Sequence, residues 1–170
     1  MHKPLLFTLG LLTAAPGLAA SIEVEVELPK FDVADYRRPY VAIWLERPDN
    51  SVAANLAVWY DAKMRNDEGS KWLKDMRQWW RRTGRSLELP IDGVTSATRH
   101  PGQHTLKFSA GEAPLGELAA GEYRLLVEAA REHGGRELLS LPLQWPPTAD
   151  ARSEVRGEHE LGTVSLQLRP

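Results

Sequence analysis

Hydrophobic and polar positions alternate along much of this chain with the period of β-strands. Residues 21–28 alternate apolar and acidic side chains, which predicts a strand with one solvated face at an edge or outer position of a sheet. Residues 40–46 are apolar almost throughout, and a Pro-Asp-Asn turn follows at 48–50. Residues 54–61 are again mostly apolar and would form the second strand of a hairpin. This pattern predicts a central hairpin that is buried on both faces.

Four later segments complete the predicted set of strands. Residues 121–132 have helical propensity, but their Tyr-x-Leu-x-Val alternation and the Gly134-Gly135 turn favour a hairpin with residues 138–145. Pro142 has no amide hydrogen to donate, which predicts an edge strand or a bulge there. The four segments are 104–109, 121–132, 138–145 and 162–168.

One segment has the period of an amphipathic helix. Between residues 71 and 82 a stripe of apolar side chains recurs at helical spacing, Ser70 can cap the start, and Gly84 follows the end. Short strands with one inserted amphipathic helix indicate an all-β fold, an antiparallel immunoglobulin- or fibronectin-like β-sandwich with Trp44, Trp59 and Leu73 buried. The helical stripe consists of Trp72, Leu73, Met76, Trp79 and Trp80.

The N-terminal residues 1–20 have the three parts of a signal peptide. His2 and Lys3 form a short basic start, residues 5–12 form an apolar run, and small residues before position 21 provide a cleavage site. The apolar run is too short for a permanent transmembrane helix, so we expect no stable membrane insertion. The sequence therefore predicts an exported, periplasmic protein with a single domain over residues 21–170.

Composition narrows the chemistry that the chain can perform. It has no cysteine, which excludes disulfides, thiolate metal sites, cysteine nucleophiles and a lipoprotein anchor. Without Lys3, 20 basic side chains stand against 23 acidic ones, a net charge of −3, which gives no support for nucleic-acid binding. The histidines are scattered over different predicted loops and strands, and no pair lies at i, i+4 on a predicted helix as in a zinc site, so no metal centre is expected.

Residues 92–98, Asp-Gly-Val-Thr-Ser-Ala-Thr, carry the most specific motif. They resemble the Asp-x-x-Ser/Thr-Gly/Ser-Ala-Thr pattern at which FAD:protein FMN transferases join FMN, through its phosphate, to the last threonine. That residue is Thr98 here, and we expect it to lie on an exposed loop. Its five specified positions match by chance in about one chain in a thousand of this length.

The residue types suit that modification. The Thr98 hydroxyl can attack the FMN phosphorus of FAD and expel AMP, and the slim side chains of Gly93, Ser96 and Ala97 let another enzyme's active site approach. Asp92 can help the transferase to recognise the loop, hold a metal or accept the hydroxyl proton. The alternative is an ordinary loop, because Asp-Gly is a strong turn dipeptide and Ser/Thr-rich runs such as the one with Thr95 join many strands.

Other residues near the motif are candidates to contact a flavin. Arg99 and His100 follow Thr98 directly and are candidates to hold the phosphate or the N1–C2=O edge of the ring; as an alternative, both are solvated loop residues. Trp79 and Trp80 are candidates for stacking on the ring, although core packing is the commoner role at helical spacing. The basic helix face with Lys71, Lys74, Arg77, Arg81 and Arg82 is either a docking surface or a solvated face.

The whole mature chain resembles the predicted periplasmic family known as domain of unknown function 2271. The resemblance is carried by residues 40–46, the tryptophan-rich helix, the loop 92–102 and the Gly-x-Tyr-x-Leu-x-Val-Glu-Ala segment 121–129. It implies a flavin carrier that is modified outside the cytosol and works beside a PepSY-type membrane protein that passes electrons across the membrane. The threonine motif also occurs in FMN-bearing subunits of sodium-pumping NADH:quinone reductase and Rnf complexes, which the rest of the chain does not resemble.

The sequence is compatible with two functions. The first is extracytosolic electron transfer by covalent FMN on Thr98, in which the protein is a carrier rather than a turnover enzyme. The second is a non-redox, immunoglobulin-like binding module of the periplasm that recognises a partner through its loops.

Overall fold

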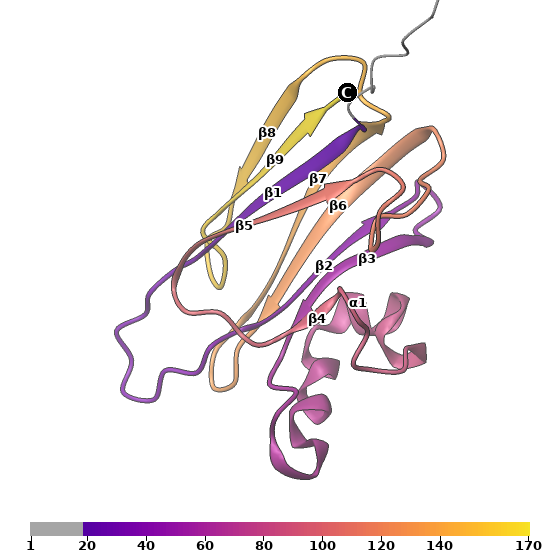
Figure 1. The fold of residues 1–170 in the computed structure, drawn as a ribbon. Coiled ribbons are helices and arrows are strands. Elements are labelled where there is room, and N and C mark those ends of the chain that lie inside the picture. The colour runs from indigo at the N-terminus through magenta and orange to yellow at the C-terminus, as the bar shows by residue number, and fades with distance from the viewer. Residues whose placement is uncertain (1–18) are drawn as a thin grey trace, which may run out of the picture.

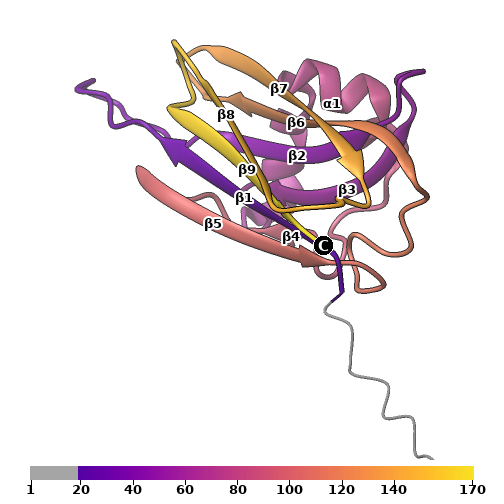
Figure 2. The same ribbon diagram turned by 90° about the horizontal axis from the view of Figure 1, so that it is seen from above.

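The computed structural model describes residues 19–170 and shows a β-sandwich of two sheets (Figures 1 and 2). The four-stranded sheet has the order β5-β1-β9-β8, and the five-stranded sheet has the order β4-β3-β2-β6-β7. The predicted all-β sandwich is confirmed. The strands are β1 (Ser21–Leu28), β2 (Tyr40–Glu46), β3 (Val52–Trp59), β4 (Thr95–Ser96), β5 (Gly102–Ser109), β6 (Gly121–Ala130), β7 (Arg136–Trp145), β8 (Ala151–Arg156) and β9 (Thr163–Arg169).

Strand neighbours differ from the prediction in three places. β1 has the predicted alternation of buried and half-buried residues, but it lies between β5 and β9 and is not an edge strand. β8 was not predicted at all. β4 pairs with β3 in parallel, through Val58 with Thr95 and Trp59 with Ser96, within an otherwise antiparallel fold. β7, which contains Pro142, forms an edge of its sheet as predicted.

The β2–β3 hairpin is buried on both faces, as its continuous apolar pattern predicts. Ile43 and Trp59 point into the core between the two sheets. Trp44 and Val58 point to the opposite face and pack in a second core beneath the helical segment. Figures 1 and 2 show that segment covering the outer face of the five-stranded sheet. Trp44, Trp59 and Leu73 are each at most 1% exposed, which confirms their predicted burial.

The helical segment is not the single regular helix of the prediction. It consists of the 3-10 helix η1 (Arg65–Asp75), the α-helix α1 (Arg77–Arg82) and the 3-10 helix η2 (Gly84–Ser86). At Met76, between η1 and α1, a ψ of 74° breaks the helical path. The apolar stripe is therefore divided, and Trp72 is 42% exposed whereas Trp79 is fully buried.

Two buried carboxylates join the helical segment to the sheet. Glu128 on β6 accepts hydrogen bonds from the backbone amides of Gln78 and Trp79 at the start of α1, and it pairs with Arg136. Glu46 at the end of β2 pairs with Arg82 at the other end of α1. Charged groups are rarely buried unless they are paired, so these contacts define where the helix lies.

The predicted signal peptide, residues 1–20, lies outside the described residues except for Ala19 and Ala20. Within residues 19–170, no helix combines the length and the apolar character that crossing a membrane requires.

Replacing Trp79 and Trp72 tests the division of the helical stripe. We expect Trp79→Ala to lower the free energy of unfolding by about 3–5 kcal/mol, because a large cavity opens in the core. The Asn55 oxygen would also lose its hydrogen bond from the Trp79 indole. Trp72→Ala should change it by no more than about 0.5 kcal/mol, as is usual at the surface. Urea unfolding measures both variants. Equal losses of stability would contradict the division of the stripe and would support a single amphipathic helix.

A pH dependence is expected from Glu137 on β7. Burial raises the pKa of its carboxyl, but the amides of Glu158, Leu161 and His159 donate to it and outweigh burial, so that the net pKa is below its ordinary value. A carboxyl whose pKa is lower in the folded protein stabilises the fold above the unfolded pKa, and that contribution is lost as the pH falls through the folded pKa.

We therefore expect Glu137→Gln to lower the free energy of unfolding by about 1–3 kcal/mol at neutral pH. The difference from the unmodified sequence should shrink below pH 4.5, the ordinary pKa of the group. Urea unfolding at a series of pH values measures it, and a difference that grows as the pH falls would contradict the role of the carboxylate.

Candidate functional site

The first half of the motif is a turn held by its own backbone. The Ile91 carbonyl accepts hydrogen bonds from the amides of Val94 (3.2 Å) and Thr95 (2.8 Å). The Ile91 amide donates to the Thr95 hydroxyl at 2.9 Å. Gly93 has a φ of +70°, a conformation that glycine adopts without strain, and its amide donates to the Asp92 carboxylate. Asp92, Gly93 and Thr95 thus build the turn.

The next residues fix the motif to the edge of the five-stranded sheet. The carbonyls of Val94 and Ser96 accept hydrogen bonds from the amides of Val58 (2.9 Å) and Tyr60 (3.0 Å). Ala97 is exposed, and Thr98 follows two residues after the short strand β4. Because β4 is pinned, the position of Thr98 is determined to within the freedom of those two residues.

Arg99 and His100 have contacts other than with Thr98. The Arg99 guanidinium lies over the Trp59 ring, 5.3 Å from its centroid, and is 3.4 Å from the Ser96 hydroxyl. The His100 carbonyl lies 2.7 Å from the His104 ring nitrogen Nε2 on β5. Both side chains are exposed.

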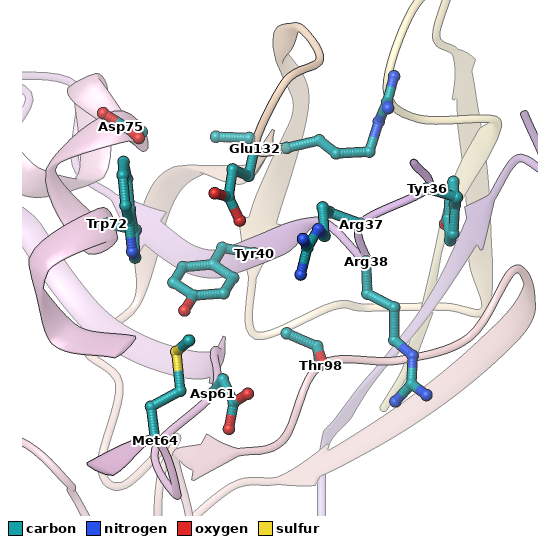
Figure 3. A pocket seen from close by; sticks show the side chains of 12 residues that line it. Tyr36, Arg37, Arg38, Tyr40, Asp61, Met64, Trp72, Asp75, Thr98 and Glu132 are labelled. Carbon is teal, nitrogen blue, oxygen red and sulfur yellow. The ribbon is translucent and has the colours of Figure 1, made fainter. Parts of the chain in front are cut away.

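Thr98 lies in the loop after β4 and is half-buried, where we expected an exposed position. It lines a cavity of about 340 Å³ (Figure 3). No hydrogen bond to its hydroxyl is found among residues 19–170, so the oxygen is not committed to a structural role there. Of the motif residues, Thr98 is the one that lines this cavity.

The cavity is enclosed by four segments that are distant in the sequence. The loop between β1 and β2 provides Tyr36, Arg37 and Arg38, and β2 begins with Tyr40. The remaining lining residues come from the connection after β3, from η1 and from the end of β6. They are Asp61, Met64, Trp72, Asp75, Ala130, Arg131 and Glu132.

The arginines of the cavity differ in their partners. Arg131 is almost fully buried, pairs with Glu160 at 2.8 Å, and lies 4.5 Å from the Phe31 ring centroid. Arg37 pairs with Asp35 at 3.1 Å, where both side chains are more than half exposed, so little energy holds this pair. Arg38 is exposed and forms no ion pair in the described part of the chain.

The tyrosines of the cavity are neutral hydroxyl groups at physiological pH. Burial raises the pKa of Tyr36 above its ordinary value. Burial also raises the pKa of Tyr40, which the Asp61 backbone partly offsets. The Tyr36 oxygen is buried and has no hydrogen-bond partner among residues 19–170.

The tryptophans that we considered for stacking lie elsewhere. Trp79 is fully buried and its indole donates to Asn55 at 2.9 Å, so it packs in the core. Trp80 is half-buried against the same core, and neither lines the cavity beside Thr98. The tryptophan at the cavity is Trp72, which the helical pattern had assigned to the buried stripe.

Arg37 and Arg38 in the loop before β2, and Tyr40 at the start of β2, were missed as residues of the cavity. The adjacent arginines in an aperiodic loop were the one signal that could have pointed to them. Nothing in the spacing of the sequence indicates that this loop lies beside residue 98.

Together, the fold and the cavity define a β-sandwich in which a threonine hydroxyl without a hydrogen bond among residues 19–170 lies beside aromatic and arginine side chains. The family model for DUF2271, described as a predicted periplasmic protein, matches residues 21–163, and the chain belongs to this family. That description agrees with the periplasmic location predicted from the signal peptide. Searches of curated proteins and of solved structures found no match.

The two threonines of the motif should respond differently to loss of the hydroxyl. Thr95→Val removes the acceptor of the Ile91 amide and should lower the free energy of unfolding by about 1–2 kcal/mol. Thr98→Val removes no hydrogen bond and should change it by about 0.5 kcal/mol or less. Urea unfolding compares the variants. A larger loss at Thr98 than at Thr95 would show that the Thr98 hydroxyl is structural.

Proposed function

We propose that Thr98 carries FMN in a phosphoester bond and that the protein is an electron carrier of the periplasm. The observation that carries the proposal is the position of Thr98: within the flavinylation motif, this residue lines the cavity and its hydroxyl has no hydrogen bond among residues 19–170. The other polar motif residues have structural contacts, since Thr95 closes the turn and Asp92 binds the Gly93 amide.

The composition of the cavity is compatible with a flavin mononucleotide. Its volume of about 340 Å³ is within the range of small-molecule pockets, which begins at about 300 Å³. Arginine side chains suit a phosphate, and aromatic rings suit a flat heterocycle. Arg37, Arg38, Tyr40 and Trp72 would be the residues that hold the group.

Attachment requires a nucleophile, a leaving group and an acceptor for the proton. The Thr98 oxygen forms a bond to the FMN phosphorus of FAD, the pyrophosphate bond breaks and AMP leaves, while a base takes the hydroxyl proton. The transferase would catalyse this step. Asp92 is exposed on the turn and Ala97 is exposed beside Thr98, so both are accessible to that enzyme.

A bound flavin supplies redox chemistry that no side chain of this protein has. The protein would hold it outside the cytosol, where a dissociable cofactor would be lost by diffusion. The likeness to flavin carriers implies a PepSY-type membrane protein as the electron partner, and we include that partner in the proposal. The periplasmic location of the family supports it.

Mass spectrometry of the exported protein tests the attachment. Co-expressed with an FAD:protein FMN transferase, the protein should gain the mass of one FMN less one water, on the peptide that contains Thr98. Thr98→Ala should abolish the gain, whereas Thr98→Ser should retain part of it, because the nucleophile is kept. Asp92→Ala should reduce labelling while the fold is preserved.

Ser96→Gly provides the matched control, because glycine is also accepted at that position of the motif and labelling should persist. Equal labelling of Thr98→Ala and the unmodified sequence would overturn the assignment. A colourless, unlabelled protein from a host with active transferase would favour the periplasmic binding module.

A further inference from the structure

Trp72 is a large apolar side chain, yet it is exposed at the surface instead of packing in the core. It is 42% exposed on η1, and Met64 beside the same cavity is 40% exposed. Large apolar side chains at the surface of a cavity commonly mark a ligand-binding surface. Figure 3 shows the Trp72 ring at one side of the cavity and Thr98 at another, with Tyr40 between them.

We propose that the isoalloxazine ring of FMN on Thr98 stacks on Trp72, while Arg37 and Arg38 bind its phosphate. This inference rests on the proposed function and adds the position at which the flavin ring binds. The ribityl chain separates the phosphate from the ring, so a ring tethered at Thr98 lies away from the threonine and reaches across the cavity.

Both arginines with available guanidinium groups lie on the Thr98 side of the cavity. In Figure 3, Arg37 and Arg38 lie toward Thr98, where the phosphate would be, together with Asp61, and Asp75 lies next to Trp72. Asp75 would repel a phosphate but not a neutral ring, whereas on the Thr98 side two guanidinium groups stand against the single carboxylate of Asp61. Arg38 has no ion pair among residues 19–170, and the Arg37 pair with Asp35 is exposed, so both guanidinium groups are available.

The buried arginine Arg131 supports the loop that carries these two groups. Its guanidinium lies over the rings of Phe31 and Tyr36, at 4.5 Å and 5.8 Å from their centroids, and its pair with Glu160 is buried. The loop is thereby packed against the end of β6, which keeps Arg37 and Arg38 on the side of the cavity that contains Thr98. We regard Arg131 as a positioning residue.

Fluorescence of the FMN-labelled protein tests the stacking. Tryptophan donates an electron to an excited flavin that stacks on it and so quenches it. The fluorescence yield per bound FMN should therefore rise several-fold in Trp72→Ala and less in Trp72→Tyr, because the phenol ring also donates an electron. Val33→Ala is the control, because Val33 is also exposed, at 48%, and does not line the cavity. Full labelling with the same yield in Trp72→Ala as in the unmodified sequence would overturn the inference and leave the proposed function intact.

Binding of free flavins makes the test independent of attachment. Protein from cells without the transferase should bind FMN, and Trp72→Ala should weaken binding of both FMN and riboflavin about two- to tenfold. Arg38→Gln should weaken FMN binding by a similar factor and leave riboflavin, which has no phosphate, unchanged. Equilibrium dialysis measures both ligands.

The two sets of results separate the two claims. If Thr98 is never labelled but free FMN binding depends on Trp72 and Arg38, the cavity is a flavin site and the covalent proposal is wrong. If free FMN does not bind, and Trp72→Ala does not change the fluorescence yield of the labelled protein, the proposed position of the ring on Trp72 is wrong. An equal loss of FMN and riboflavin binding in Arg38→Gln would overturn the role of Arg38 toward the phosphate.

Discussion

The β2–β3 hairpin is apolar on both faces, and a sheet of this kind must be covered on both sides to be stable in water. The four-stranded sheet covers one face. The other face needs the helical segment, whose Leu73, Met76 and Trp79 enclose Trp44 and Val58. That requirement brings η1 alongside the start of β2 and the motif loop, and the cavity forms where these segments meet. The candidate site is therefore a consequence of how the outer face of the sheet is closed.

Much of this fold could be predicted from periodicity, because periodicity reports which faces of an element are buried. It located the β2–β3 hairpin, the buried tryptophans Trp44 and Trp59, and the edge strand with Pro142. It does not report which strands are neighbours, and so β1 was wrongly placed at an edge. β8 was missed because most of its residues are exposed at the edge of a sheet and carry little apolar signal.

The helical segment shows a second limit of the pattern. Trp72 and Trp79 are separated by a helical repeat in the sequence, yet the break at Met76 turns one out to the cavity and the other into the core. Backbone breaks of this kind depend on tertiary contacts, here the Glu128 carboxylate at the start of α1, which lies far away in the chain. The motif pointed to Thr98, which lines the cavity, but its neighbours across the cavity, Arg37 and Tyr40, come from a segment that no local pattern connects to it.

A crystal structure of the protein exported from cells with an FAD:protein FMN transferase would test the central claim most directly. Our account predicts continuous density from the Thr98 oxygen through a phosphate, with the flavin ring in the cavity against Trp72. A structure of flavin-containing protein in which the Thr98 hydroxyl is unmodified, and the flavin is attached to another residue, would contradict it.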